Sequence, residues 1–367
     1  MIKVRTLVTS AAGRTGSEAV RLLLEKGYSV RAFVHRDDGR AAALRDLGAE
    51  IFVGDLFDFR DLQAALKDVQ RAYHCPPFAQ NLLHNTMLFC LAAEDAGLEV
   101  LALLSGWNTH ETHPSALTRE HWIANNIARW MPTVDVIHIN PGLFAFSYLL
   151  TLPVTAKLGL LPLPYGKGKN APVSARDIAR VVASVLDDPA RHVGKSYRPT
   201  GPALLDPGQI AATIGKVVGR KVRYRDVPFK MMAKAAKAQG FSTFDTANLR
   251  YYAQELAAGA FAIGGATTHV EEVTGAPAES FEETVRRYHA NPELIAPGMA
   301  HLSTLGALRF MARMMMTRAP DLDAFEVERG FPKLTNPLLA HENSAWTSDA
   351  HAQLLHLLRP LNQRKAT

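Results

Sequence analysis

The feature that most constrains the fold is a short glycine-containing turn near the start of the chain. An apolar segment at 4–9 leads into Ser10-Ala11-Ala12-Gly13-Arg14-Thr15-Gly16, and a helical pattern follows. A backbone can approach phosphate oxygens closely only where side chains are small, and a helix N-terminus adds free N–H groups and a favourable dipole. Gly13 and Gly16 meet this need, with Ser10 near the first glycine position of a three-glycine motif. The turn therefore predicts a site for the pyrophosphate of a dinucleotide.

The end of the second expected strand, at 28–34, indicates which dinucleotide. That strand runs into His35 and Arg36. An acidic residue at this point would bind the ribose 2′-hydroxyl of NAD, whereas the guanidinium of Arg36 suits a 2′-phosphate. We therefore expect NADP(H). The alternative is that Arg36 is a solvated loop charge and that Asp37 or Asp38 contacts the ribose.

The apolar segments recur along the first part of the chain with helical patterns between them. Further strands are expected at 50–53, 71–75, 98–104 and 134–139. This order predicts an α/β fold with a doubly wound parallel sheet of the Rossmann type and a smaller, mostly helical C-terminal part. We expect a dinucleotide-binding Rossmann domain at 1–150, a substrate-enclosing portion at 151–291 and a helical C-terminal extension at 292–367.

Helical patterns dominate the second half. One is expected at 173–187, and another begins at the N-cap Asp206, with Pro207 at its first position, and ends at Gly219. In the extension, a Met-rich helix is expected at 299–318 and a last helix near 348–358. A stripe of Met and Leu at helical spacing is more typical of core or a subunit contact than of a ligand site. A homodimer formed through the extension is therefore possible.

The composition of the chain limits the binding partners and the cellular compartment that we expect. The net charge of +6 over 367 residues is a modest excess. Its densest cluster, at 220–237, suits a solvated face better than a nucleic-acid site, so we expect a small-molecule substrate and neither nucleic acid nor membrane as partner. Cys75 and Cys90 are the two cysteines and show no metal-ligand spacing, which predicts no metal site and a reduced, cytoplasmic protein. The chain begins directly with a strand, so no secretory signal is expected.

Taken in order, several short motifs resemble the NmrA-like group of atypical short-chain dehydrogenases. They are the turn at 9–16, Val30-Arg31-Ala32, Gly54-Asp55-Leu56, Asn140-Pro141-Gly142-Leu143-Phe144, Asp177-Ile178-Ala179, Gly194-Lys195-Ser196-Tyr197, Thr200-Gly201-Pro202, Val273-Thr274-Gly275 and Phe281-Glu282-Glu283. The resemblance covers about the first 290 residues.

The resemblance implies a set of cofactor contacts. Gly13, Arg14, Thr15 and Gly16 would line the pyrophosphate, Arg36 the 2′-phosphate, and Asp55 and Leu56 the adenine. Pro76 would lie near the nicotinamide ribose, or Pro76 and Pro77 simply shape the loop. The carboxylate of Asp55 can accept a hydrogen bond from the adenine amino group, but it can equally serve as a helix N-cap.

The catalytic pattern of short-chain dehydrogenases is missing. They use a Tyr-x-x-x-Lys pair, yet this chain has no Tyr between Tyr73 and Tyr148 and no Lys between Lys67 and Lys157. The expected positions fall near Thr118 and Trp122. Hydride transfer to an electron-poor acceptor such as a quinone needs less acid assistance and remains feasible.

Other side chains in this part of the chain are candidates for the reaction. His110, His113 and His121 lie in the segment expected to face the nicotinamide, and His121 is our candidate proton donor, although each can also be a surface or capping residue. Ser105 can donate to a substrate oxygen or simply cap a strand. An aromatic wall for a flat substrate is expected from Trp107, Phe144, Phe146 and Tyr148, which core packing explains equally well.

The sequence leaves three functions open. The first is an NADP(H)-dependent oxidoreductase that reduces a hydrophobic, aromatic or quinone-like small molecule without the Tyr/Lys pair. The second is a non-catalytic NADP(H)-sensing regulatory protein, and the third is an isomerase that does not consume its cofactor. The histidines and aromatic residues favour the first function, and the missing pair favours the second.

Overall fold

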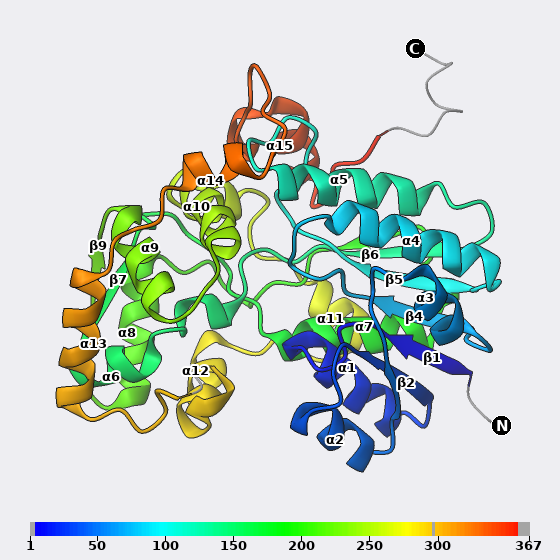
Figure 1. The fold of residues 1–367 in the computed structure, drawn as a ribbon, viewed down its shortest axis with the longest axis horizontal. Helices are drawn as coiled ribbons and strands as arrows, with labels where there is room; N and C mark the ends of the chain where they lie inside the picture. The colour runs from blue at the N-terminus through cyan, green and yellow to red at the C-terminus, as the bar shows by residue number, and fades with distance from the viewer. Residues whose placement is uncertain (1–3, 296–297, 359–367) are drawn as a thin grey trace.

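A central parallel sheet organises the computed structural model, which describes residues 4–295 and 298–358 (Figure 1). Its seven strands have the order β3-β2-β1-β4-β5-β6-β8, and every neighbouring pair is parallel. The strands are β1 (Arg5–Val8), β2 (Ser29–Val34), β3 (Glu50–Val53), β4 (Arg71–His74), β5 (Val100–Leu104), β6 (Asp135–Ile139) and β8 (Ser196–Tyr197). The α/β, doubly wound fold class is confirmed.

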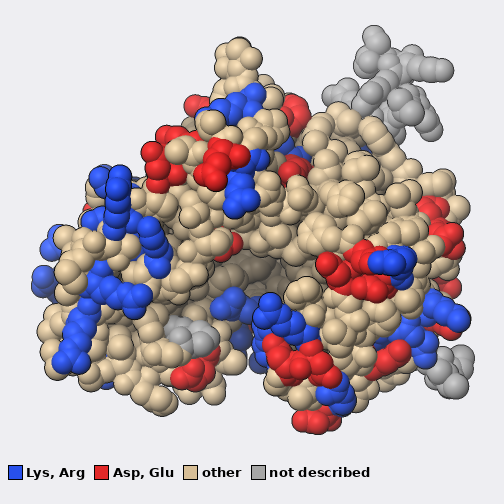
Figure 2. Space-filling view, viewed as in Figure 1, with Lys and Arg blue, Asp and Glu red and all other residues tan. Residues whose placement is uncertain are grey.

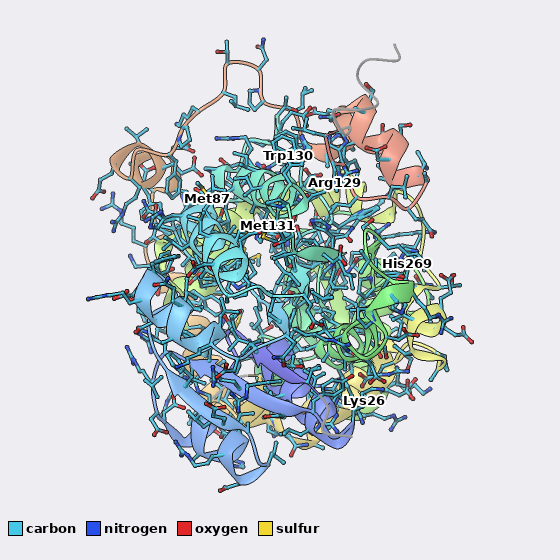
Figure 3. The ribbon with its side chains drawn as sticks, turned by 90° about the vertical axis from the view of Figure 1, so that its right-hand side faces the viewer. Lys26, Met87, Arg129, Trp130, Met131 and His269 are labelled. Carbon is cyan, nitrogen blue, oxygen red and sulfur yellow. The ribbon has the colours of Figure 1, made fainter. Side chains whose placement is uncertain are left out.

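Helices cover both faces of this sheet, as its buried strands require. Helices α1 (Arg14–Glu25) and α7 (Ala175–Asp187) pack together on one face, with α2 (Gly39–Asp46) beside them, and α3 (Phe59–Leu66), α4 (Leu82–Asp95) and α5 (Ala116–Arg129) lie on the other. Alternation along β1 sends Val8 into the core under α1 and α7 and Leu7 into the core under α3 and α4. Lys26 at the end of α1, labelled in Figure 3, pairs with Asp187 at the end of α7 at 2.8 Å.

The outer face of α4 and α5 carries exposed apolar side chains. Figure 3 shows Met87, from α4, near Trp130 and Met131, which follow α5. Met87 and Trp130 are exposed, as is Leu91 one turn beyond Met87. Within the described chain no element covers these side chains.

The second part of the molecule is built around a small parallel sheet that the sequence reasoning missed. Its strands are β7 (Leu160–Leu163) and β9 (Arg223–Asp226), which pair in register Leu160 to Arg223. The surrounding helices are α6 (Leu152–Leu158), α8 (Pro207–Val218), α9 (Phe229–Ala238), α10 (Thr243–Ala257) and α12 (Phe281–Ala290). Asp206 forms a capping box with Gln209 at the start of α8, as expected, and Gly219 ends the helix in the left-handed conformation.

Several of the expected boundaries differ from the structure. Strand β8, which completes the main sheet, comes from beyond residue 150 and spans two residues, whereas the sequence indicated a strand and turn at 197–202. Helix α11 (His269–Thr274) likewise packs on α7 of the main sheet. The last helix, α15 (Ser344–His351), begins four residues before the expected 348, because the Asn343 side chain caps it by accepting from Trp346 N.

The C-terminal extension packs along the molecule from the second part to the main sheet (Figure 1). Helix α13 (Thr304–Met316) packs against α6 and α9, and α14 (Leu322–Glu328) packs against α10. The segment around α15 reaches the main sheet, where Trp346 Nε1 donates to the carbonyl of Trp107 at 3.2 Å. The expected Met-rich helix is thus present but shorter, and residues 359–367 of the expected extension lie outside the described residues.

Five short 3₁₀ helices complete the described elements. They are η1 (Ala145–Tyr148), η2 (Pro189–Arg191), η3 (Ala260–Ala262), η4 (Pro292–Leu294) and η5 (Ala340–Glu342).

Candidate functional site

The site lies where the strand order reverses, between the carboxyl ends of β1 and β4. In open α/β sheets, ligands bind in the crevice at such a point. Ser10 follows β1 with a positive φ of 49°, a conformation that favours glycine, and its Oγ donates to the carbonyl of Cys75 at 2.8 Å. Cys75 N in turn donates to Thr9 Oγ1 at 2.9 Å. These bonds fix the two loops that form the crevice.

The glycine turn leaves the start of α1 open to a ligand. Gly13 is the N-cap, and no side chain caps the helix there, so the first backbone N–H groups are free to bind an anion. A Cβ at Gly13 would lie 3.0 Å from the carbonyl oxygen of Ser10, and one at Gly16 would lie 2.4 Å from the same atom. Gly16 therefore lets the helix pack on the turn, while Gly13, Arg14 and Thr15 line the crevice itself.

Arg36 is an exposed cation at the end of β2. Among the described residues it forms no ion pair or side-chain hydrogen bond. The alternative ribose ligands are already engaged: Asp37 pairs with Arg45 at 2.9 Å, and Asp38 pairs with Arg40 and caps α2. Arg36 is thus the one of these charged groups without a partner among the described residues, whereas the carboxylates of Asp37 and Asp38 each already pair with an arginine.

Asp55 and Leu56 follow β3 on the same edge of the sheet. Asp55 accepts from Phe57 N at 2.9 Å and does not cap α3, since Asp58 is the N-cap there. The alternative of Asp55 as helix cap is therefore wrong. The Leu56 carbonyl accepts from the Asn85 side chain, which ties this loop to α4. Neither residue lines the crevice beside the glycine turn, and their contact with adenine stays a prediction.

A cavity of about 460 Å³ opens beside the glycine turn. Figure 2 shows the molecule hollowed between the main sheet and the second part, with Lys and Arg side chains at the rim of the hollow. Nine candidate site residues of the sequence analysis line the cavity: Ser10, Gly13, Arg14, Thr15, Pro76, Ser105, His121, Phe144 and Phe146. The uncapped start of α1 and an apolar wall thus meet in one place.

The rest of the wall comes from elements far apart in the chain. Phe146 lies in η1 and Leu150 shortly after it. Phe241 comes from the loop before α10, and Leu249 and Tyr252 come from the middle of that helix. Sequence reasoning missed the α10 residues because no local motif marks them and only the packing of α10 brings them to β5. The Arg14 guanidinium stacks over the Phe146 ring at 4.5 Å, which links the phosphate turn to the apolar wall.

Ser105 is held at the end of β5 by two hydrogen bonds. Its backbone N donates to the Ile139 carbonyl at 2.8 Å, and Asn125 Nδ2 on α5 donates to its Oγ at 2.6 Å. Because Oγ accepts from Asn125, the hydroxyl hydrogen of Ser105 remains available for a ligand in the cavity. Asn125 itself is fixed through its carbonyl, which lies 3.1 Å from His138 Nε2.

His121 lies on α5, half-buried against the cavity. Burial lowers the pKa of its imidazole to about 4. The ring is therefore neutral near pH 7, and it can donate a hydrogen bond from one N–H but is not an imidazolium acid.

His110 and His113 do not line the cavity, contrary to the expectation that they face the nicotinamide. They lie buried beside Glu255 of α10, with His113 Nε2 at 3.0 Å from Glu255 Oε1. His113 Nδ1 accepts from Ser115 N at 3.0 Å, so its ring proton is on Nε2 and is donated to the carboxylate. Burial lowers the pKa of both histidines to about 3 and raises that of Glu255 to about 7.

Two of the expected substrate-binding aromatic residues belong to the core instead. Trp107 is buried under the guanidinium of Arg198 at 3.8 Å and against Trp346. Tyr148 is buried among Tyr165 and Phe281 in the core of the second part. The assignments of Trp107 and Tyr148 to the aromatic wall are therefore wrong, whereas Phe144 and Phe146, which were expected with them, do line the cavity.

The positions expected for the Tyr/Lys pair contain no substitute acid. Thr118 is buried and its N donates to Ser115 Oγ at 3.2 Å, while Trp122 lies on the same helix. A tyrosine does reach the cavity from another element: Tyr252 of α10, whose hydroxyl is 3.8 Å from the position of a Cβ at Gly106. Burial raises the pKa of Tyr252 to about 12, so its phenol is a neutral donor.

Comparison with known proteins gives the family. The model of the NmrA-like family matches residues 3–284. The chain belongs to the NmrA-like family. It is 30% identical over 287 residues to the NAD(P)H azoreductase of Xenophilus azovorans, covering 77% of this chain and 98% of that protein. It is 26% identical over 243 residues to quinone oxidoreductase 2 of Escherichia coli, covering 64% and 81%.

Solved structures of low identity share the fold. The triphenylmethane reductase of Citrobacter sp., complexed with NADP(H), has a TM-score of 0.68 at 21% identity and covers 77% of this chain and 99% of that one. NmrA, a negative transcriptional regulator in complex with NADP, has a TM-score of 0.66 at 16% identity and covers 78% and 95%. In the described part of this chain, no helix combines the length and apolar character needed to cross a membrane.

Proposed function

We propose that this protein is an NADPH-dependent reductase of flat, hydrophobic, electron-poor molecules, of which quinones and azo compounds are the model. The observation that carries the proposal is the meeting of the phosphate-binding turn with an apolar cavity at the carboxyl edge of β1 and β5. The azoreductase and quinone oxidoreductase relatives, whose names state such reactions, support it. The substrate wall from α10 also supports a substrate-enclosing role for residues 151–291.

The residues present fit NADPH. The open helix N-terminus at Gly13 and Thr15 suits the pyrophosphate, and the free guanidinium of Arg36 suits the 2′-phosphate. Pro76 lies in the cavity wall just after β4, and the family resemblance assigns it to the ribose of the nicotinamide. When bound, the cofactor supplies a hydride, that is, two electrons and one hydrogen.

The chain itself orients the acceptor and supplies hydrogen-bond donors. Phe144 and Phe146 pack against a flat ring, and Ser105 and Tyr252 hold hydroxyl hydrogens near the end of β5. Reduction of a quinone balances when the ring takes one hydride and one proton to give the hydroquinone. We propose that Ser105 donates to the oxygen on which negative charge develops and that the proton comes from water. His121 contributes as a neutral N–H donor.

A non-catalytic sensor of NADP(H) is the second candidate. The absence of tyrosine and lysine at Thr118 and Trp122 favours it, because those positions hold the proton donor of related dehydrogenases. The likeness to NmrA, named as a transcriptional regulator, is of the fold alone.

One preparation can separate the two candidates. NADPH and NADH binding is measured by calorimetry, and loss of NADPH absorbance is then followed with a panel of benzoquinones, naphthoquinones and azo dyes. Turnover that falls at least tenfold in Ser105→Ala, with NADPH affinity kept, supports the reductase. Tight NADPH binding without oxidation across the panel contradicts it and supports the sensor.

We also place the protein in the cytoplasm. Cys75 and Cys90 are both free thiols, and neither forms a disulfide in the described chain. Unpaired cysteines are typical of a reducing compartment.

A further inference from the structure

A second apolar cavity of about 250 Å³ lies next to the candidate site. Ser147, Leu150, Phe241 and Leu249 line both cavities, so they form the boundary between them. Its remaining walls come from α6, β7, β9, α9 and α13, and most of the lining side chains are aliphatic or Met. Protein interiors are close-packed, and a cavity of about 150 Å³ with apolar walls already holds a benzene ring. This space is therefore large enough to receive part of a ligand.

The C-terminal extension supplies one wall of this second cavity. Phe310, Met311 and Met314 of α13 line it, and the family match ends at residue 284. The Met residues of α13 therefore have two different surroundings. Met311 and Met314 line the cavity, while Met315 is exposed to solvent. With Met231 and Met232 of α9 opposite, four thioether side chains surround the space.

The composition of the wall indicates the shape of the ligand. Methionine side chains are flexible and adapt to irregular apolar groups, so they suit a chain of many conformations better than a rigid ring. The polar members of the lining are the exposed Arg225, the half-buried Gln239 and the threonines Thr151 and Thr155, and the boundary with the first cavity is apolar except for Ser147. The two cavities thus adjoin across a boundary without charged side chains, where an aliphatic group that extended from one to the other would bury no charge.

We propose that the second cavity binds the aliphatic tail of a substrate whose reducible ring lies in the first cavity. The substrate class is thus an aromatic or quinone-like ring carrying a long alkyl or isoprenoid chain. This inference rests on the proposed reductase function for the ring, and it assigns to the extension the role of completing the tail site.

The test compares two quinones that differ in the tail alone. These are 2,3-dimethoxy-5-methyl-1,4-benzoquinone and its 6-decyl derivative, each measured by NADPH oxidation in the full-length protein. We expect kcat/KM for the decyl compound to exceed that of the short compound at least tenfold. In Met311→Trp, which fills the cavity, this ratio should fall to near one.

Met315→Trp is the matched control, since it makes the same substitution on the same helix at a side chain that is 57% exposed. It should keep the wild-type ratio. If Met311→Trp lowers the melting temperature markedly, Ala235→Leu narrows the same cavity from α9 and replaces it. A wild-type ratio near one, or a ratio that neither cavity-filling substitution changes, overturns the proposal.

A binding measurement keeps this test separate from the reductase proposal. The affinity of the decyl compound for the protein saturated with NADP⁺ is measured by calorimetry, with the short compound as reference. Tight binding that Met311→Trp weakens at least tenfold supports the tail site even if neither quinone is reduced, an outcome that contradicts the reductase alone. Equal affinity for the two compounds overturns the tail site.

Discussion

At the scale of single residues, Arg36 decides between the two nicotinamide cofactors. Its guanidinium is free, whereas the neighbouring acids Asp37 and Asp38 are paired with arginines. We expect Arg36→Ala to weaken NADPH binding on the order of 10- to 100-fold, because a charge-assisted contact with the 2′-phosphate is lost. NADH binding should change less than about threefold. Calorimetric titration with both cofactors measures the difference.

Arg60→Ala provides the control for this result. Arg60 is also exposed, but it lies on α3 and its charge is already paired with Asp58 at 2.5 Å. Its loss should leave the ratio of NADPH to NADH affinity unchanged. Equal losses of both cofactors in Arg36→Ala would remove Arg36 from the 2′-phosphate site.

Substitution of Gly16 is expected to weaken NADPH binding for a different reason. Alanine there would place a Cβ 2.4 Å from the Ser10 carbonyl oxygen and 2.9 Å from Ala11 Cα, which are backbone atoms that cannot rotate away. The turn must shift, so Gly16→Ala should lower NADPH affinity at least tenfold while the far core remains folded. Calorimetry gives the affinity, and circular dichroism gives the helical content. Unchanged affinity would show that the turn does not hold the pyrophosphate.

At the scale of elements, the sequence predicted what depends on local pattern and missed what depends on packing. The buried strands at β1, β2 and β5 and the cap of α8 follow from runs of apolar residues and from an Asp-Pro-Gly-Gln start. β7 and β9 were missed because Pro162 lies within one and charged residues fill the other, so neither has the pattern of a buried strand.

The residues of the candidate site were likewise predicted where they depend on local pattern and missed where they depend on packing. The glycine turn is local in sequence and was found, whereas Tyr252 and Phe241 reach the cavity only through the packing of α10. Trp107 and Tyr148 were assigned to the wall because aromatic residues near a strand end have the same appearance in sequence whether they face a cavity or the core. Burial distinguishes the two cases: both side chains are almost fully buried away from the cavity.

One tryptophan anchors the last helix to the main sheet. Trp346 is 1% exposed, packs edge-on against Trp107 and donates to its carbonyl. We expect Trp346→Ala to lower the free energy of unfolding by about 3–5 kcal/mol, as for other large-to-small core substitutions. Trp130→Ala, at 53% exposure, should change it by less than about 0.5 kcal/mol. Urea denaturation measures both, and similar losses would contradict the anchoring role.

At the scale of the whole molecule, buried histidines make stability depend on pH. Burial lowers the pKa of His74, His110 and His113 to about 3 and that of His121 and His138 to about 4. In the unfolded chain these groups titrate near pH 6.5. Their contribution to stability is therefore complete above that pH and is lost as the pH falls toward 4 and 3. We expect the urea midpoint to drop steeply between pH 6.5 and 4.

The stability that Glu255 contributes changes with pH in the opposite direction to that of the histidines. Its pH dependence can therefore be tested separately. Burial raises its pKa to about 7, above an unfolded value near 4.3, so its contribution is complete below that lower pH and is lost as the pH rises to about 7. In Glu255→Gln this alkaline loss disappears. The stability of the variant relative to the wild type should therefore increase between pH 4.5 and 8, by up to about 3 kcal/mol.

Urea denaturation of both proteins at half-unit steps of pH gives this difference directly. Glutamine retains an oxygen that can accept from Ala340 N and His113 Nε2, the two donors of the native carboxylate. The part of the stability difference between Glu255→Gln and the wild type that does not change with pH therefore reports packing. Only the change of this difference with pH reports the ionisation of Glu255. If Glu255 were ionised throughout as the partner of a protonated His113, the relative stability of the variant would not rise with pH over this range, and the neutral assignment of the pair would be wrong.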